Sequence, residues 1–365
     1  MPKMPHESDL VTGILEIDLG AIIANYRAMQ EQAAGAKVSA ALKADAYGLG
    51  MAKVAPALWQ AGCTDYFVAT IEEGVALRRL LSGAKIYVLN GVFAEQEAAF
   101  SAFSLIPVIN SFEQARLWRD YASEWANQSE VVLHVDTGMH RLGTSVAEVE
   151  KVMALEGLSI GMVMSHLACA NEPGHPLNAR QLKSFQIVSS MMPEVPASLA
   201  NSAGVFLGED FHFDIVRIGI SLFGGAAPSQ ALNFIKPVIR LKVRILQERV
   251  VAAGETIGYE ATHKTSTQRR IATLASGYAD GFPTGLSNHG QVVIGGQRAD
   301  IVGRVSMDLV TVDVTEIPLH LTTPGSWAEL ISPDMPIEEV ANAGNMIPYE
   351  LLTGLGRRYC RVYID

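Results

Sequence analysis

The chain has 365 residues and a net charge of −10, from 28 Lys and Arg against 38 Asp and Glu. Hydrophobic residues make up 49% of the chain and charged residues 18%, which is typical of a folded protein and excludes a disordered one. The negative charge argues against nucleic acid and anionic membranes as partners, because both are bound through basic patches. No apolar run approaches the roughly 20 residues of a membrane span.

The three cysteines, Cys63, Cys169 and Cys360, are few, odd in number and far apart. They are typical of free thiols in a reducing compartment. The first ten residues contain no apolar core of signal-peptide length, so we expect a cytoplasmic protein. We expect no metal site, because His166 and Cys169 have no second Cys/His pair at ligand spacing.

The first two-thirds of the chain alternates between apolar, strand-like runs and helix-like segments. Residues 15–18 alternate like a strand, and Asp18 is predicted to cap a helix over 19–34. Eight strands are then predicted at 38–43, 66–70, 85–89, 105–109, 131–135, 161–165, 197–200 and 215–220. Helices are predicted between most of them, at 52–60, 71–81, 95–103, 112–126, 146–155 and 177–192. Eight such units close a TIM-type (β/α)₈ barrel of parallel strands.

The composition shifts near residues 233–237, and short strands separated by glycines follow. They are predicted at 238–246, 270–274, 291–294, 299–302, 309–314 and 326–330, with one helix at 337–343. The sequence therefore predicts an α/β protein with two domains, a barrel over residues 9–235 and a C-terminal β-rich domain over 236–365.

Polar residues follow the predicted barrel strands, at the ends that meet on one face. They are Lys43, Asn90, Asn110, Asp136, His166, Asn201, Ser202 and Arg217. Each alone is an ordinary turn former, but their convergence with a lysine predicts an active site. A lysine with a desolvated root has a lowered pKa and acts as a nucleophile, base or Schiff-base partner. The alternative is a lysine that reaches from a strand edge into solvent.

One stretch, residues 41–50, reads ALKADAYGLG. It closely resembles the pyridoxal-phosphate attachment motif of the alanine racemase family. The resemblance implies that Lys43 is the Schiff-base lysine and that Tyr47 binds the cofactor. Without the resemblance, Tyr47 would be assigned to packing.

A second stretch, residues 136–143, reads DTGMHRLG and resembles the D-T-G-M-x-R-x-G motif of the same family. The resemblance implies that Arg141 contacts the phenolic oxygen of the cofactor and the substrate carboxylate. The chain departs from the family at His134, where several members carry a lysine modified to a carbamate. His134 cannot form that group, so Arg141 must be oriented differently, for example by water or an anion.

Further matches continue along the barrel. His166, otherwise a structural histidine, is implied to bond the arginine that faces the cofactor ring, and Arg217 matches that arginine. Because arginine keeps its proton, the ring nitrogen should stay unprotonated and be a weaker electron sink. The resemblance places the phosphate near Asn201, Ser202, Gly219 and Ile220. Asn171 stands where many relatives have aspartate on the substrate entrance path.

Three matches lie in the last third. Residues 277–281 read GYADG, in which Tyr278 corresponds to a second catalytic base; without that match it would be a packing tyrosine. Residues 303–308 read GRVSMD, in which the backbone N–H of Met307 is implied to hold the substrate carboxylate. Tyr349 matches a tyrosine that reaches the phosphate and narrows the entrance.

The resemblance implies a pyridoxal-phosphate-dependent enzyme that interconverts L- and D-alanine, for peptidoglycan supply or alanine degradation. It implies Lys43 and Tyr278 as the two bases, and a homodimer in which Tyr278 and Met307 come from the partner subunit. Free lysine and tyrosine titrate near pH 10, so the site must lower both pKa values. A broader-specificity racemase is an alternative. Arg217 argues against a fold-type III amino-acid decarboxylase, and the last third argues against a non-enzymatic cofactor carrier.

Overall fold

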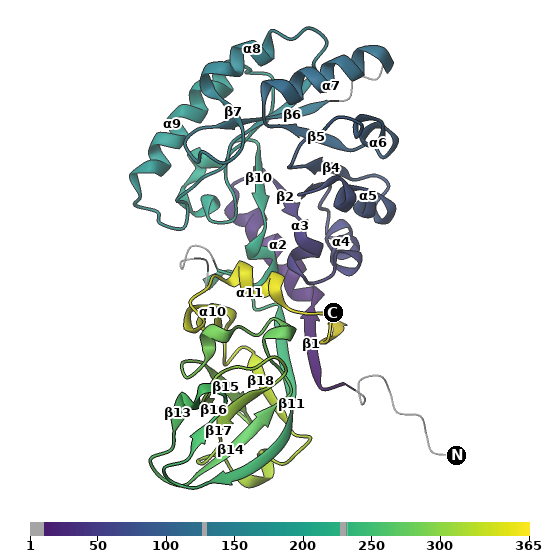
Figure 1. Ribbon diagram of the computed structural model, residues 1–365. Helices are drawn as coiled ribbons and strands as arrows, with labels where there is room; N and C mark the ends of the chain where they lie inside the picture. The colour runs from purple at the N-terminus through teal and green to yellow at the C-terminus, as the bar shows by residue number, and fades with distance from the viewer. Residues whose placement is uncertain (1–10, 126–129, 227–230, 232) are drawn as a thin grey trace, which may run out of the picture. The chain divides into compact units, whose positions relative to one another are not determined.

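The computed structural model describes residues 11–125, 130–226, 231 and 233–365, and the chain divides into two compact units (Figure 1). Ile22–Lys236 form the first, called here the barrel unit. Met1–Ala21 and Pro237–Asp365 form the second, called here the β unit. Within the described residues, every helix is too short or too polar to cross a membrane.

The barrel unit is built on parallel strands whose order around the sheet is β10-β2-β3-β4-β5-β6-β8-β9. All eight predicted strands are confirmed: β2 (Lys37–Ala41), β3 (Asp65–Val68), β4 (Lys85–Val88), β5 (Ile106–Ile109), β6 (Val131–Asp136), β8 (Ile160–Met164), β9 (Ala197–Ser198) and β10 (Ile215–Ile218). The strands are short apolar runs because helices cover one face and the barrel interior fills the other. A two-residue strand, β7 (Thr144–Ser145), pairs in parallel with Val135 and Asp136 at the end of β6.

The barrel is nearly closed, and the closing contact lies beside predicted site residues. An isolated parallel bridge joins Asn201 to Arg217, and the Arg217 N–H donates to the Ala200 oxygen at 2.9 Å. The predicted barrel fold is therefore confirmed. The bridge that nearly closes the barrel joins Asn201 and Arg217, both of which are predicted site residues.

Helices alternate with these strands and lie outside the sheet (Figure 1). They are α2 (Leu19–Gln32), α4 (Met51–Gln60), α5 (Ile71–Leu80), α6 (Glu97–Ala102), α7 (Phe112–Trp125), α8 (Val149–Met153) and α9 (Pro176–Ser190). Asp18 caps α2 as predicted, since its Oδ1 accepts the Ala21 N–H at 2.7 Å. Thr70 and Glu73 form a reciprocal capping box at the start of α5.

The β unit is an antiparallel sheet with one parallel edge pair. Its order is β16-β15-β18-β11-β1-β19, and β14 joins β11 to β17. The strands are β1 (Gly13–Asp18), β11 (Ile239–Val251), β14 (Arg269–Leu274), β15 (Gln291–Ile294), β16 (Gln297–Asp300), β17 (Val310–Asp313), β18 (Trp327–Ile331) and β19 (Cys360–Ile364). The strand β1 runs antiparallel to β11 and parallel to β19, so the first strand among the described residues belongs to this sheet.

Four details of the β unit differ from the sequence prediction. The strand expected at 299–302 lies two residues earlier, because a turn at Gly295 and Gly296, with φ of 58° and 80°, pairs Ile294 with Gln297. The helix α11 (Pro348–Gly354) and the strand β19 were not predicted, nor was the small hairpin of β12 (Thr256–Ile257) and β13 (His263–Lys264). The helix α10 (Ile337–Ala343) has its predicted bounds.

Candidate active site

Lys43 stands at the start of a left-handed turn. It opens the short helix α3 (Lys43–Tyr47), in which residues 44–47 all have φ between 54° and 56°. Left-handed angles cost a non-glycine residue roughly 1–2 kcal/mol each, so other contacts must hold the turn. Glu73 accepts the Ala44 N–H at 2.6 Å, and Asp45 accepts the Met51 N–H at 2.7 Å. These carboxylates fix the backbone that carries Lys43.

The surroundings of Lys43 favour its neutral form. Burial lowers its pKa most, and the positive charges of Arg141 and Arg217 lower it further. The Glu73 carboxylate acts in the opposite direction. A lysine that loses its proton more readily than usual is suited to act as a nucleophile or base.

The Arg217 guanidinium is buried and donates hydrogen bonds to several neighbours at the C-terminal ends of the barrel strands. Its Nη1 donates to the carbonyl oxygen of Ser198 at 2.9 Å and to its hydroxyl at 2.7 Å. Its Nη2 donates to the Ser165 oxygen at 2.5 Å and to Nδ1 of His166 at 3.2 Å. Burial lowers the pKa of Arg217 to about 10, so the guanidinium stays charged at pH 7.

His166 is held in its neutral form with a defined tautomer. Because Arg217 can only donate, Nδ1 of His166 accepts and the ring proton lies on Nε2. Desolvation, followed by the charges of Arg217 and Arg141, lowers the pKa of His166 well below its ordinary value. The predicted contact between His166 and an arginine is present in the structure.

Arg141 is carried by a loop that Asp136 organises. Oδ1 of Asp136 accepts the N–H groups of Gly138 at 2.9 Å, Met139 at 2.9 Å and His140 at 3.1 Å. Burial alone would raise the pKa of Asp136, but these three donors outweigh it and the pKa is lowered. Arg141 itself is exposed, and no hydrogen bond or ion pair to it is present in the described part of the chain.

Gln181 is a buried residue of α9 that sequence reasoning missed. Its Nε2 donates to the His166 oxygen at 2.9 Å and to the Thr137 hydroxyl at 3.3 Å, while its Oε1 accepts the Ala168 N–H at 2.9 Å. The Thr137 hydroxyl also lies 2.7 Å from that of Ser165. Gln181 therefore ties the loop that carries Arg141 to the loop that carries His166. No motif marks it, because its role depends on contacts between distant segments.

The ends of β9 and β10 form a small cradle of backbone N–H groups. The Ser202 hydroxyl accepts the N–H of Gly219 at 2.9 Å and that of Ser221 at 3.5 Å. A Cβ atom at Gly219 would lie 2.3 Å from the Tyr47 hydroxyl, so only glycine fits there. Asn201 caps the following turn by accepting the Gly204 N–H, and Ile220 opens the short helix η4 (Ile220–Phe223).

The β unit holds the other predicted residues. The motifs of Tyr278 and Met307 lie side by side, since the N–H groups of Tyr278 and Ala279 donate to the oxygens of Ser306 and Met307, both at 3.0 Å. The side chains of Tyr278 and Met307 are 47% and 53% exposed. Tyr349 lies on α11, where burial raises its pKa to about 12.

Arg358 holds the two motifs together and was also missed by sequence reasoning. Its Nε and Nη2 donate to the two carboxylate oxygens of Asp280 at 2.5 Å and 2.8 Å, and its Nη1 donates to Asp308 at 2.7 Å. Asp280 lies within the Tyr278 motif and Asp308 ends the Met307 motif. The fork geometry of the guanidinium suits this double contact.

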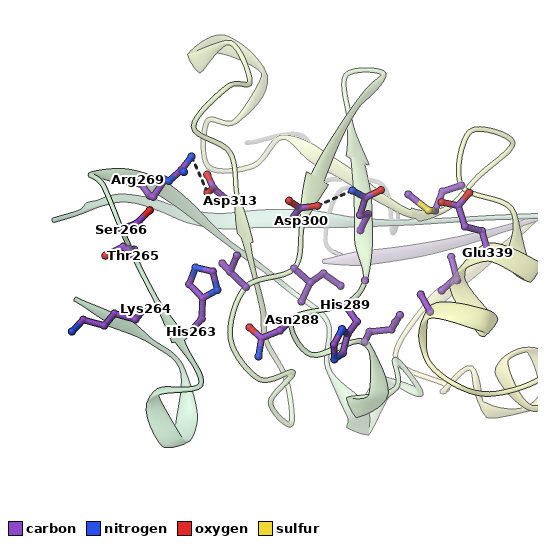
Figure 2. A pocket seen from close by; sticks show the side chains of 18 residues that line it. His263, Lys264, Thr265, Ser266, Arg269, Asn288, His289, Asp300, Asp313 and Glu339 are labelled. Atoms are coloured by element: carbon purple, nitrogen blue, oxygen red, sulfur yellow. Dashed lines mark hydrogen bonds and ion pairs between the residues drawn. The ribbon is translucent and has the colours of Figure 1, made fainter. Parts of the chain in front are cut away.

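Two pockets lie away from the predicted residues. The larger, of about 530 Å³, belongs to the β unit, and Figure 2 shows basic and acidic side chains mixed around it. Arg269 pairs there with Asp313 at 3.6 Å, and Asp300 accepts from Gln291 at 2.7 Å. The smaller, of about 290 Å³, lies at the N-terminal ends of the barrel strands, where Lys37 pairs with Asp65. Within the described residues, no three His, Cys, Asp or Glu side chains gather as metal ligands would.

The comparisons with known proteins agree along the whole chain. The family model for the alanine racemase N-terminal domain matches residues 17–227, and that for the C-terminal domain matches residues 238–363. A catabolic alanine racemase of Agrobacterium fabrum is 45% identical over 97% of this chain and 92% of its own length. An alanine racemase of Rhizobium meliloti is also 45% identical, over 96% of both chains.

Solved structures show the same likeness. The alanine racemase of Bartonella henselae, which carries covalently bound pyridoxal phosphate, superposes with a TM-score of 0.93 at 40% identity, over 97% of this chain and 100% of that one. The biosynthetic alanine racemase of Pseudomonas aeruginosa gives a TM-score of 0.90 at 34% identity, with the same coverage. The chain belongs to the alanine racemase family.

Proposed function

We propose that this protein interconverts L- and D-alanine with pyridoxal phosphate attached to Lys43, and that Lys43 and Tyr278 are its two bases. One observation carries the proposal. A lysine of lowered pKa lies in one cluster with Arg141, Arg217 and His166, at the end of the barrel where active sites form. The relatives named above are alanine racemases, one of them with the cofactor covalently bound.

The residues present fit the cofactor. The Ser221 hydroxyl is fully buried and has no hydrogen-bond partner, beside the N–H cradle at Ser202 and Gly219. An orphaned buried donor next to backbone N–H groups suits a phosphate, which accepts from several donors at once. Ser221 thus joins Tyr47, Asn201, Ser202, Gly219, Ile220 and Tyr349 as a proposed phosphate-site residue, and it is the one that the sequence prediction had not included.

The cofactor, when bound, makes the α-proton of the amino acid acidic by accepting electron density into its ring. Arg217 would limit that acceptance, because a guanidinium that is still charged at pH 7 offers only N–H donors and would leave a protonated ring nitrogen without a hydrogen-bond acceptor. His166, neutral and bonded to Arg217, adds no charge to the cluster. This arrangement favours return of the α-proton to the substrate over decarboxylation or transamination.

The substrate carboxylate is assigned to Arg141 and to the backbone N–H of Met307. Arg141 is exposed and has no protein partner in the described residues, so its guanidinium is available to an anion. Lys43 Nζ takes or returns the α-proton on one face and Tyr278 Oη does so on the other. By the family resemblance, Tyr278 serves the L enantiomer and Lys43 the D enantiomer.

A homodimer completes this proposal. Tyr278 and Met307 are half-exposed neighbours on the β unit, which suits residues that enter a partner's site. A two-fold dimer would then contain two identical composite sites. The three cysteines are far apart in the sequence, which is typical of free thiols in a reducing compartment and supports a cytoplasmic enzyme. The relatives include both a catabolic and a biosynthetic alanine racemase.

Borohydride fixation tests the proposal directly. The purified holoenzyme, reduced with borohydride and digested, should carry the cofactor on the peptide that contains Lys43 and on no other. The unreduced enzyme should racemise alanine from either enantiomer. Label on a different lysine would contradict the attachment site. In a panel of amino acids, equal rates for bulkier substrates would favour the broader-specificity racemase, and release of carbon dioxide would favour a decarboxylase.

A further inference from the structure

The side-chain amide of Gln181 makes two bonds to the backbone on either side of Leu167. Its Nε2 donates to the His166 oxygen at 2.9 Å, and its Oε1 accepts the Ala168 N–H at 2.9 Å. A carbonyl oxygen only accepts and a backbone N–H only donates, so these two partners fix which way the amide points. Gln181 is fully buried, so both bonds are shielded from water.

These two bonds repeat the pattern of a parallel β-ladder. In such a ladder, a residue donates to the oxygen that precedes the residue facing it and accepts the N–H that follows that residue. The facing residue here is Leu167, which lies past the end of β8 at Met164. In the described residues, the last backbone bond from β8 to β9 runs from the Ser165 N–H to the Ser198 oxygen, at 3.0 Å. Gln181 therefore continues the pairing of β8 where no strand does.

The segment that Gln181 holds carries the ring that Arg217 contacts. Nη1 of Arg217 donates to the carbonyl and hydroxyl oxygens of Ser198, and Nη2 donates to the Ser165 oxygen and to Nδ1 of His166. These contacts engage both Nη atoms of the guanidinium. A shift of the backbone at residue 166 would remove the side-chain acceptor of Nη2 and loosen the guanidinium.

A second path joins Gln181 to Arg217 through hydroxyl groups. Nε2 of Gln181 also donates to the Thr137 hydroxyl at 3.3 Å, and that hydroxyl lies 2.7 Å from the one of Ser165. The carbonyl oxygen of Ser165 in turn accepts from Arg217 at 2.5 Å. The side chains along this path are buried, and buried polar networks of this kind lose order when one member is removed.

We propose that Gln181, by extending the pairing of β8 with its side-chain amide, is the positioning residue for the pair of His166 and Arg217. This inference rests on the proposed function, in which Arg217 faces the cofactor ring. Gln181 touches neither substrate nor cofactor in that proposal. It holds the backbone at residues 166 and 168, and so it sets where the His166 ring meets the guanidinium.

A matched pair of substitutions on α9 tests this role. Gln181→Met keeps the approximate length of the side chain and removes the amide. Asn178→Leu is the control, because Asn178 is also buried on α9 and its Nδ2 donates to the oxygens of Cys169 at 3.2 Å and Glu172 at 3.0 Å. Both variants lose an amide that holds the chain after β8, but only Gln181→Met releases residues 166 and 168.

Nitrogen NMR of histidine-labelled holoenzyme follows the His166 ring without using activity. Burial, then the charge of Arg217, keeps the pKa of His166 well below its ordinary value. In Gln181→Met the ring should move away from Arg217 and gain water, so its pKa should rise by about one unit or more. Asn178→Leu should keep the wild-type titration. An unchanged His166 titration in folded Gln181→Met, or an equal rise in both variants, would overturn the proposal.

Hydrogen exchange of the wild-type holoenzyme keeps the test independent of how the variants fold. The Ala168 N–H, read at single-residue resolution, should exchange at least about tenfold more slowly than in an unfolded peptide, although it lies past the end of β8. Exchange at the unfolded rate would overturn the proposal. Borohydride label on Lys43 decides the proposed function separately, since its absence from the wild type would contradict that function whatever Ala168 and His166 show.

Discussion

Four consecutive residues after Lys43 adopt left-handed angles although none of them is glycine. Alanine, at positions 44 and 46, strongly prefers the right-handed helix, so its local preference opposes the observed conformation. Glu73 offsets part of this cost, because its two carboxylate oxygens accept the N–H groups of Ala44 at 2.6 Å and Ala69 at 2.8 Å. Glu73 therefore stabilises the left-handed turn and also contributes a negative charge near Lys43.

Substitution of Glu73 should therefore change the chemistry of Lys43. Glu73→Gln removes a carboxylate that raises the pKa of Lys43, so that pKa should fall further below its ordinary value. In the cofactor-free enzyme, the pH midpoint for reaction of Lys43 with an amine reagent, measured by peptide mass spectrometry, should move to lower pH. Glu72→Gln is the matched control, since Glu72 lies on the exposed face of the same helical turn. The same midpoint in both variants would count against this role of Glu73.

At the scale of elements, apolar runs marked the strands well because the barrel strands are buried on both sides. The exact bounds and register of individual strands and helices were harder to predict. The strand β16 begins with Gln297 and Arg298, whose polar side chains are exposed, so the register came from the Gly295–Gly296 turn and not from hydrophobicity. The helix α11 was missed although Pro348 occupies its first turn, a known start signal.

The candidate site likewise contains residues that the sequence predicts and residues that it does not. Residues that lie within motifs, such as Lys43 and Tyr278, could be singled out from the sequence. Gln181 and Arg358 could not, because each contacts segments far away in the chain and neither lies in a motif that the sequence analysis used. Asn110 was noted only as one polar residue after a strand; its contact with His134 depends on the neighbouring positions of β5 and β6 in the barrel.

Arg358 offers a test at the element scale, because it links the loops of Tyr278 and Met307 through Asp280 and Asp308. Arg358→Gln should lower kcat/KM for alanine by about tenfold or more, since misplacing catalytic loops is costly, while the fold remains intact. Arg298→Gln is the matched control, because Arg298 forms a comparably forked pair with Glu339 in the same unit. Steady-state kinetics and circular dichroism would decide, and equal losses in both variants would contradict the linking role.

At the scale of the whole molecule, the proposed site residues are divided between two units. Lys43, Arg141, His166 and Arg217 belong to the barrel unit, whereas Tyr278, Met307 and Tyr349 belong to the β unit. We propose that a two-fold dimer brings the two groups together from different subunits, since an isologous interface would create both sites at once.

Subunit mixing tests this arrangement. Lys43→Ala and Tyr278→Ala should each be inactive alone. Co-expressed or refolded together, half of the dimers should be mixed, with one doubly altered site and one intact site, so activity should recover to about a quarter of the wild type. Mixing Lys43→Ala with itself is the control. Verified mixed dimers that remain inactive would show that Lys43 and Tyr278 act within one chain.

The two proposed bases act on opposite faces of the substrate, and α-hydrogen exchange measures that assignment most directly. In heavy water, single-turnover exchange from L-alanine and from D-alanine is compared in Tyr278→Phe and the wild type. Loss of a positioned base costs about 100-fold or more, so exchange from L-alanine should fall by that factor while exchange from D-alanine, served by Lys43, stays near the wild-type rate. Equal losses for the two enantiomers would contradict the two-base assignment.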